Sequence, residues 1–224
     1  MTVLLGSSGV CWSADFQKGV DAYDRGDYAT VLKEWTPLAE QGDARAQTIL
    51  GVMYHEGQGV PEDDKTAVKW YTLAAEQGYA NALSTLGVMN ENGRGVPQDY
   101  KTAKKWYTLA AEQGNATAQY NLGVMYGMGQ GVPEDYKTAV KWWTLAAEQG
   151  LAPAQFNLGL MYAKGDGVIK DNVYAHMWGN IAASNGYKKG GVLQDLVVVT
   201  MTPAQIEEAQ KLARECVAKN YKGC

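Results

Sequence analysis

The residues that could carry chemistry in this chain are few and scattered. His55 and His176 are the two histidines, and neither has a cysteine or a carboxylate at the spacing of a metal-ligand set. A protein-bound metal needs several such ligands at one place, so we expect no metal site. The repeated GxGV segments lack the lysine and Ser/Thr of a phosphate-binding loop, and the chain contains no GxSxG nucleophile elbow. The sequence therefore predicts no catalytic residue and no cofactor.

Acidic pairs recur in segments that read GVPED, at residues 59–63 and 131–135. Neighbouring carboxylates can act as general acid and base or bind calcium. An active site needs one such constellation, whereas this one is repeated along the chain. We therefore expect the aspartates to cap helices, because an N-cap carboxylate accepts hydrogen bonds from the free amides of the first helical turn.

The repetition has a period of 36 residues. The phrase AEQG occurs at residues 39–42, 75–78, 111–114 and 147–150. Two further columns keep the same register: Asp27, Asp63, Asp99, Asp135 and Asp171 in one, and Leu50, Leu86, Leu122 and Leu158 in the other. Such a period indicates a stacked repeat protein, in which each unit buries its apolar face against its neighbours. We expect one elongated domain without an internal linker.

Each unit contains two helical patterns separated by glycine and proline. In the clearest copy, helices are expected over 115–127 and 135–150, with the turn between them. On the first helix of an earlier unit, Ala46, Leu50 and Tyr54 share one face, which we expect to pack. Two small-residue columns on a separate strip, which include Ala44 and Gly51, would let neighbouring helices approach closely.

The second helix of each unit shows a similar division. Ala67, Trp70 and Ala74 are expected to form its inner stripe. Lys65 and Lys69 are expected to point outward as a solvated face.

The motifs LGVMY, GxGVPxD, KTAxKWY and LAAEQG, repeated in register, resemble the Sel-one-like repeat, a relative of the tetratricopeptide repeat. The resemblance covers four units, at residues 43–78, 79–114, 115–150 and 151–186. It implies an all-α fold, a right-handed α/α superhelical solenoid of helix-turn-helix repeats that serves as a platform for protein contacts.

The two ends depart from the repeat and are expected to cap it. Residues 14–42 lack the GxGVP loop and are closer to an ordinary tetratricopeptide hairpin. Residues 187–224 are expected to form capping helices. In that segment Thr202, Pro203 and Gln205 supply an N-cap, a first-turn proline and a capping box for a last helix that reaches about Lys219.

Cys216 and Cys224 lie eight residues apart at the C-terminal end. In an oxidising compartment a disulfide would hold the tail against the last helix, and we favour this bond over the alternative of two free thiols.

Residues 1–13 resemble the remnant of a secretory signal peptide, with a short apolar run and small residues before a possible cleavage site. No Lys or Arg precedes Val3, so a misplaced start is the alternative and the true N-terminus is open. Val10 is a poor fit to the residue that precedes a lipidated Cys11. We expect a periplasmic or secreted bacterial protein without a transmembrane segment, since no later run approaches the roughly 20 apolar residues that span a bilayer. A net charge of -4 gives no reason to expect nucleic acid as a partner.

One stripe of the first helices, opposite their packing face, varies from repeat to repeat while the packing columns stay constant. We call it the variable stripe, and the resemblance to tetratricopeptide arrays implies that it lines the concave surface. It contains Arg45, Thr48, Asn81, Ser84, Val88, Glu91, Thr117, Tyr120, Asn121, Val124, Phe156, Asn157 and Leu160. Tyr120 and Phe156 are expected to be aromatic anchors, and the amides of Asn121 and Asn157 to hold a peptide backbone.

The sequence therefore predicts a noncatalytic scaffold or adaptor whose partner is a protein or peptide segment. Two alternatives stay open. Some secreted members of the resembled family are associated with binding or hydrolysing β-lactams or cell-wall fragments, although they carry a cysteine pair in each repeat that this chain lacks. The second alternative is a structural homo-oligomer, in which another copy of the chain occupies the concave surface.

Overall fold

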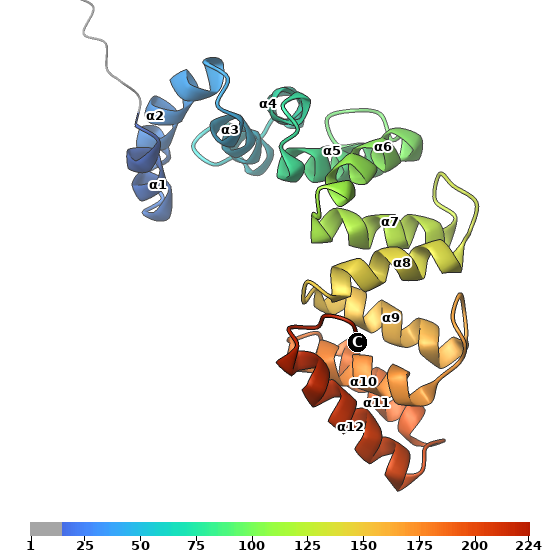
Figure 1. Ribbon diagram of the computed structural model, residues 1–224. Coiled ribbons are helices and arrows are strands. Elements are labelled where there is room, and N and C mark those ends of the chain that lie inside the picture. The colour runs from blue at the N-terminus through green and yellow to red at the C-terminus, as the bar shows by residue number, and fades with distance from the viewer. Residues whose placement is uncertain (1–14) are drawn as a thin grey trace, which may run out of the picture. The chain divides into compact units, whose positions relative to one another are not determined.

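The computed structural model describes residues 15–224, so the predicted signal-peptide remnant at residues 1–13 lies outside the described residues. Within the described range every regular element is a helix (Figure 1). The helices divide between two compact units, up to Gln77 and from Gly78 onward.

The first unit contains four helices in its described part. They are α1 (Phe16–Asp24), α2 (Tyr28–Glu40), α3 (Ala44–Glu56) and α4 (Asp64–Glu76). The α1–α2 hairpin turns at Gly26, which has a φ of 71°, and forms the predicted short N-terminal pair. Helices α3 and α4 are the first pair with the long GxGVP turn.

The second unit contains three more such pairs and two additional helices. The pairs are α5 (Ala80–Asn92) with α6 (Tyr100–Glu112), α7 (Ala116–Met128) with α8 (Tyr136–Ala147), and α9 (Ala152–Lys164) with α10 (Asn172–Ser184). The additional helices are α11 (Lys189–Val198) and α12 (Pro203–Ala218). Each pair packs along its length, and the second helix of a pair packs against the first helix of the next within the unit.

The repeated aspartates cap the second helices, as predicted. Asp63, Asp99, Asp135 and Asp171 are the N-caps of α4, α6, α8 and α10, and each accepts from first-turn amides. The hydrogen bond from the Thr66 hydroxyl is the main reason that the pKa of Asp63 lies below its ordinary value. These carboxylates therefore have a structural role in every repeat.

A glycine notch fixes how closely the two helices of a pair approach. A Cβ atom on Gly51 would lie 2.6 Å from the Tyr71 ring, and one on Gly87 or Gly123 would lie 2.4 Å from Tyr107 or Trp143. The aromatic side chain of the second helix thus fills the space that the glycine leaves, which confirms the expected close approach.

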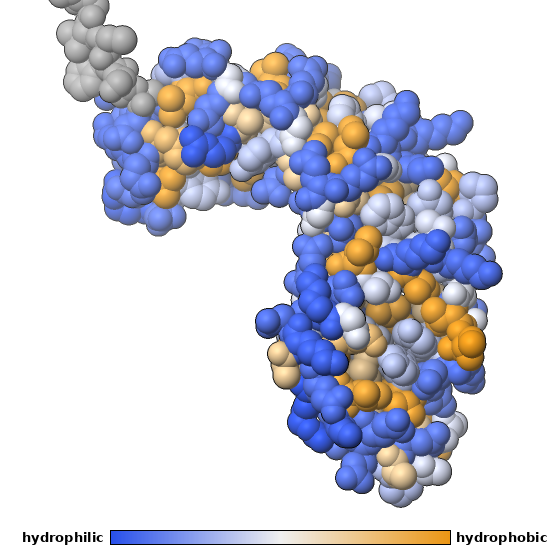
Figure 2. Space-filling view, in the orientation of Figure 1, coloured by the Kyte–Doolittle hydropathy of each residue, from blue (hydrophilic) through white to orange (hydrophobic). Residues whose placement is uncertain are grey.

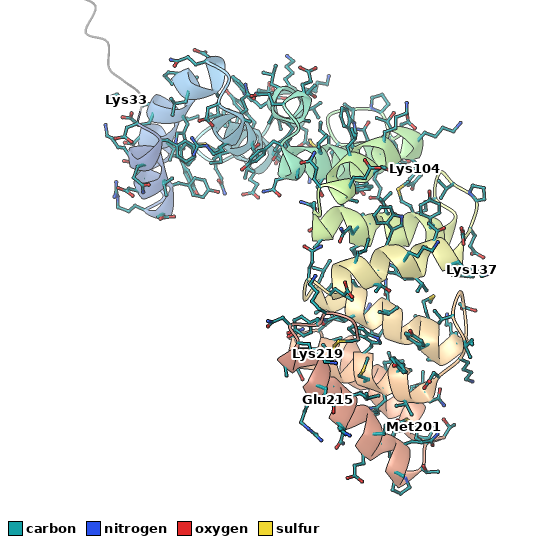
Figure 3. The ribbon with its side chains drawn as sticks, viewed as in Figure 1. Lys33, Lys104, Lys137, Met201, Glu215 and Lys219 are labelled. Atoms are coloured by element: carbon teal, nitrogen blue, oxygen red, sulfur yellow. A yellow bond between two sulfur atoms is a disulfide. The ribbon has the colours of Figure 1, made fainter. Side chains whose placement is uncertain are left out.

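The same notch corrects the predicted inner stripe of α4. The buried residues of α4 are Ala67, Tyr71, Ala74 and Ala75, whereas Trp70 is only half buried. Tyr71, one position later, is the residue that faces Gly51, and Trp70 instead packs, half buried, against the cluster that contains Leu50 and Met53. Lys65 and Lys69 are exposed as predicted, and Lys137, the α8 counterpart of Lys65, projects outward in Figure 3.

Buried glutamines explain the repeated AEQG phrase. Gln47 Nε2 donates to the carbonyl oxygen of Ala39 at 2.9 Å, and Gln77 Nε2 donates to Gln47 Oε1 at 2.8 Å. Gln119 and Gln149 repeat this chain in α7–α8. In these two repeats the glutamine of the first helix thus satisfies a backbone carbonyl of the preceding second helix and is itself held by the AEQG glutamine of its own repeat.

Two repeats depart from this pair of glutamines, each at a different one of the two positions. Asn185 replaces the AEQG glutamine in α9–α10 and donates to Gln155 Oε1 at 2.9 Å. Leu83 takes the place of the first-helix glutamine in α5, so that repeat has no side-chain amide at this position.

The last helix begins as predicted. Thr202 is the N-cap, Pro203 opens the helix, and Thr202 and Gln205 form both hydrogen bonds of a capping box. Helix α12 packs against α10 and ends at Ala218, and Figure 3 shows Glu215 on its last turn and Lys219 at its C-cap.

Helix α11 packs on both α9 and α10. Its contact with α10 is close, because a Cβ on Gly190 would lie 2.4 Å from the carbonyl oxygen of Gly179. No helix within residues 15–224 is long and apolar enough to span a bilayer.

Candidate binding surface

The variable stripe lies on α3, α5, α7 and α9, and its residues differ in exposure. Arg45, Asn81 and Thr117 are exposed; Thr48, Val88, Glu91, Tyr120, Asn121, Val124, Phe156, Asn157 and Leu160 are half buried; Ser84 is buried. Ser84, at 6% exposed, is a correction to the predicted contact surface: its side chain is too short to rise past its neighbours on α5.

In the first unit the stripe residue Arg45 is engaged by the N-terminal hairpin. Its guanidinium lies 4.0 Å from the centroid of the Phe16 ring and 2.8 Å from Asp43 Oδ2. The cation and the ring attract each other, so Arg45 is held by α1 as well as by its own N-cap residue.

On α5 and α7, polar stripe residues bond to one another through a tyrosine. The Tyr107 hydroxyl donates to Glu91 Oε2 at 2.6 Å and also interacts with the Asn121 amide. Burial is the main cause of the raised pKa of Tyr107, and the Glu91 carboxylate adds to it. Asn121 is therefore a partner of Tyr107 rather than a free amide.

Tyr120 and Asn157 form a second polar contact, between α7 and α9. The Asn157 side chain lies near enough to the Tyr120 hydroxyl to lower its pKa, and the Tyr187 hydroxyl lies near enough to raise it. The pKa of Tyr120 is raised chiefly by burial. The aromatic face of this half-buried tyrosine packs beside Val124 on the core around Trp143.

On α9 the stripe meets another helix. Phe156 and Leu160 pack against a cluster that contains Leu193 and Val197 of α11. The Phe156 ring also lies 5.4 Å from the ring of Tyr187, in the turn before α11. The predicted anchor Phe156 is thus already in contact with the C-terminal cap of its own chain.

Tyr187, Leu193 and Val197 were absent from the predicted surface. The segment from 188 to 199 carries apolar residues at both 192/196 and 193/197, a spacing that indicates a helix with two apolar sides. The sequence does not state which helix each side meets, because that depends on where the chain turns after α10.

Other side chains that could carry chemistry make structural contacts. His55 Nδ1 lies 2.5 Å from Asp64 Oδ1, a contact that joins α3 to α4. Within residues 15–224, no group of three or more His, Cys, Asp and Glu side chains is arranged to hold a metal ion.

The C-terminal tail returns to the helices of the last two repeats. The Tyr221 hydroxyl donates to Asn185 Oδ1 at 3.1 Å, and the Gly223 amide donates to Glu148 Oε1 at 3.0 Å. The structure pairs Cys216 with Cys224, whose Cα atoms are 5.5 Å apart. Formation of this bond in the purified protein stays a prediction.

Helix pairs at a 36-residue period, joined by a shared notch and a shared glutamine position, define an α/α repeat protein. The sequence model of the Sel1 repeat matches residues 44–79, 80–115, 116–151 and 152–187. The chain therefore belongs to the Sel1 repeat family, and its all-α solenoid class is as predicted.

Solved structures of bacterial relatives agree with this assignment. A Sel1 repeat protein from Oxalobacter formigenes is 33% identical, with a TM-score of 0.77 over 80% of this chain and 74% of that one. The protective antigen c5321 of uropathogenic Escherichia coli, which displays an SLR fold, is 28% identical, with a TM-score of 0.56 over 90% of this chain and 53% of that one.

A third structure is similar in fold alone. A putative Sel1 repeat protein from Klebsiella pneumoniae is 23% identical, with a TM-score of 0.52 over 80% of this chain and 89% of that one. No curated protein matches the sequence.

Proposed function

We propose that this protein is a noncatalytic interaction scaffold that binds a peptide or protein segment along the variable stripe. Sel1 repeats generally serve as protein-protein interaction scaffolds. The observation that carries the proposal is that Phe156 and Leu160, two stripe residues of α9, already receive the apolar side chains of another helix, α11. The stripe position is therefore suited to accept a segment that packs across the first helices.

The corresponding positions on α7 supply the proposed contact surface. Tyr120 and Val124 correspond to Phe156 and Leu160 one repeat earlier, and both are half buried. In the described part of the chain α7 packs against α6, α8 and, more weakly, α5, whereas α11 packs on α9. We assign to a partner segment the position over α7 that α11 takes over α9.

Export to the periplasm or beyond is part of the proposal. The pairing of Cys216 with Cys224 supports it, because disulfides persist in oxidising compartments and are rare in the cytosol. The known relatives with solved structures include an antigen of a bacterial pathogen, which is compatible with display outside the cytosol.

Site-specific photo-crosslinking in native envelope extract tests the binding surface. A photoreactive side chain at Thr117, which is exposed on α7, should capture a partner, and one at Lys137, which is exposed on α8, should not. Mass spectrometry should locate the crosslink in one contiguous partner segment. The capture should be lost when Tyr120→Ala is added.

Equal capture from Thr117 and Lys137, or capture that does not change with Tyr120→Ala, would contradict binding at the stripe. Hydrolysis of a chromogenic β-lactam that persists through repurification would contradict the noncatalytic assignment.

A further inference from the structure

Helix α11 has an exposed apolar side. Val192, Leu196 and Val199 are 68%, 63% and 78% exposed, and their spacing of four and three residues places them on one side of the helix. Leu193 and Val197, on another side of α11, are buried against the rest of the unit. Contiguous patches of exposed apolar side chains mark interaction sites, whereas single exposed apolar residues are common on any protein surface. Figure 2 shows that apolar side chains also reach the surface elsewhere in the second unit, so the exposure of apolar side chains does not by itself identify a binding site.

The exposed side of α11 adjoins a groove, which distinguishes it from scattered apolar residues. A cavity of about 300 Å³ lies between α9 and α11. Its lining is Phe156 and Leu160 from α9 and Lys189, Val192, Leu193 and Leu196 from α11. This volume is at the lower end of the range of roughly 300–1,000 Å³ found for ligand pockets, so it suits a few side chains.

The charge at the groove has one sign. Lys189 is the ionisable residue in the lining, and Lys188 precedes it as the N-cap of α11 without a side-chain hydrogen bond to the helix. The first turn of α11 has no acidic residue, so two lysines occupy the positive end of the helix dipole without a carboxylate on that turn. Both features favour a carboxylate at this end of the groove. Asp195, the acidic residue of α11, is outside the lining.

We propose that the groove between α9 and α11 binds a partner-protein segment that carries two neighbouring apolar side chains with an acidic residue beside them. The apolar side chains enter between Phe156, Leu160 and Leu196, and the carboxylate meets Lys189. This inference rests on the proposed scaffold function, and it specifies the chemistry of the bound segment at the C-terminal end of the variable stripe.

Selection from a displayed library of random 12-residue peptides on the immobilised full chain tests the proposal. The enriched peptides should share two apolar residues and an Asp or Glu. Fluorescence anisotropy with one labelled consensus peptide then gives its affinity. Leu196→Glu should weaken binding at least tenfold, because it places a carboxylate at the apolar wall next to the acidic ligand.

Charge reversal makes the test specific. Lys189→Glu should weaken binding of the acidic peptide at least tenfold. A peptide with Lys in place of its acidic residue should regain affinity for that variant. Leu109→Glu is the matched control: Leu109 is a comparably exposed leucine on α6 of the same unit, and this variant should bind as wild type does. Thermal unfolding followed by circular dichroism verifies that each variant is folded.

Three results would overturn the proposal. If the selected peptides lack acidic residues or bind Leu196→Glu unchanged, the proposed groove is not their site. If their binding instead depends on Tyr120, the scaffold function stands and this inference fails. If no peptide is enriched, or binding depends on neither residue, both fail. If sedimentation velocity shows a dimer that Leu196→Glu abolishes, the exposed side of α11 binds a second copy of the chain.

Discussion

Helices α7 and α9 occupy the same position in successive repeats and bury the same types of core residue, yet their variable stripes have different surroundings. Leu122 and Leu158 are equally buried, and in both helices the following glycine accommodates side chains from the facing helices. On the stripe, Tyr120 and Val124 of α7 correspond to Phe156 and Leu160 of α9. The α9 pair is in contact with α11, and the α7 pair is proposed to meet a partner.

The difference indicates that the core positions of a repeat serve stability, whereas its stripe positions vary with what packs on them. Where a helix of the same chain packs on the stripe, the aromatic residue is phenylalanine, which needs no polar partner. Where the stripe lacks that helix, the aromatic residue is tyrosine, whose hydroxyl lies beside the Asn157 side chain. A buried tyrosine hydroxyl needs a hydrogen-bond partner, whereas a phenylalanine ring needs only apolar contact. The core columns can therefore stay constant while the stripe changes with its occupant.

The largest expected effect tests whether the two cores are equivalent. Leu122→Ala and Leu158→Ala each remove a fully buried side chain and leave a cavity, so each should lower the free energy of unfolding by about 2–5 kcal/mol. Urea unfolding measures both. A large loss for one variant and a negligible loss for the other would mean that the two core positions are not equivalent, and the comparison between the stripes of α7 and α9 would fail.

The C-terminal disulfide provides the next largest effect, and it acts on the end that carries α11 and α12. Closing the short loop between Cys216 and Cys224 restricts the unfolded chain, which should contribute about 2–3 kcal/mol. Cys216→Ser together with Cys224→Ser should lose this amount in urea unfolding. Intact mass after alkylation without reductant shows whether the bond is present. Alkylation of both Cys216 and Cys224, counted apart from Cys11, in protein purified from an oxidising compartment would contradict the pairing and remove its support for export.

Much of the fold was predictable because each repeat solves the same packing problem. The period, the aspartate caps, the glycine notch and the last capping box follow from local chemistry that the sequence states directly. Trp70 was misplaced because adjacent aromatic residues both suit an inner stripe on a helical wheel. The position of the facing glycine, which decides between Trp70 and Tyr71, is a tertiary fact.

The candidate surface was less predictable for a similar reason. A helical wheel identifies which side of α9 faces away from the packing columns, but it does not state what lies over that side. Phe156 was expected to await a ligand, and it contacts Tyr187 and the α11 cluster. The amide of Asn157 was expected to hold a peptide backbone, and it lies beside the Tyr120 hydroxyl. Both contacts depend on residues from other elements, which periodicity within one helix does not reveal.

Two adjacent glycines of α11 allow a test of its packing against α10, which positions α11 beside the α9 stripe. A Cβ on Gly190 would lie 2.4 Å from the Gly179 carbonyl oxygen, whereas one on Gly191 would meet nothing within 4 Å. Gly190→Ala should therefore destabilise the unit by about 1–3 kcal/mol through overpacking. Gly191→Ala should stabilise it by about 0.4–1 kcal/mol, because alanine restricts the unfolded chain.

Hydrogen exchange distinguishes loss of the α11 contact from a general loss of stability. In Gly190→Ala the amides of α11 and of α9 around Phe156 should exchange faster, while those of α7 should keep their wild-type protection. Equal acceleration in α7 and α9 would show that α11 does not act specifically on the α9 stripe. Identical behaviour of the two alanine variants would contradict the close crossing of α10 and α11.

The smallest expected effect concerns His176, which takes the α10 position that Val140 holds in α8. The imidazole is 5% exposed, and its buried Nδ1 has no hydrogen-bond partner among the described residues. Burial lowers the pKa of His176 below its ordinary value, so the unfolded chain binds a proton at higher pH than the folded chain does. Stability should thus be full above the unfolded pKa of about 6.5 and decline as the pH falls through it toward the folded pKa.

His176→Val copies the residue of the preceding repeat and removes this titration. Between about pH 7.5 and 5.5, the range around the ordinary histidine pKa, the melting temperature of wild type should fall more than that of the variant. His55 is present in both proteins, so the difference between their two slopes isolates His176. Parallel pH profiles would mean that the folded chain accommodates the charged imidazole as well as water does. In that case α10 would tolerate a cation where α8 has valine, and the C-terminal repeat would be less tightly packed than the structure indicates.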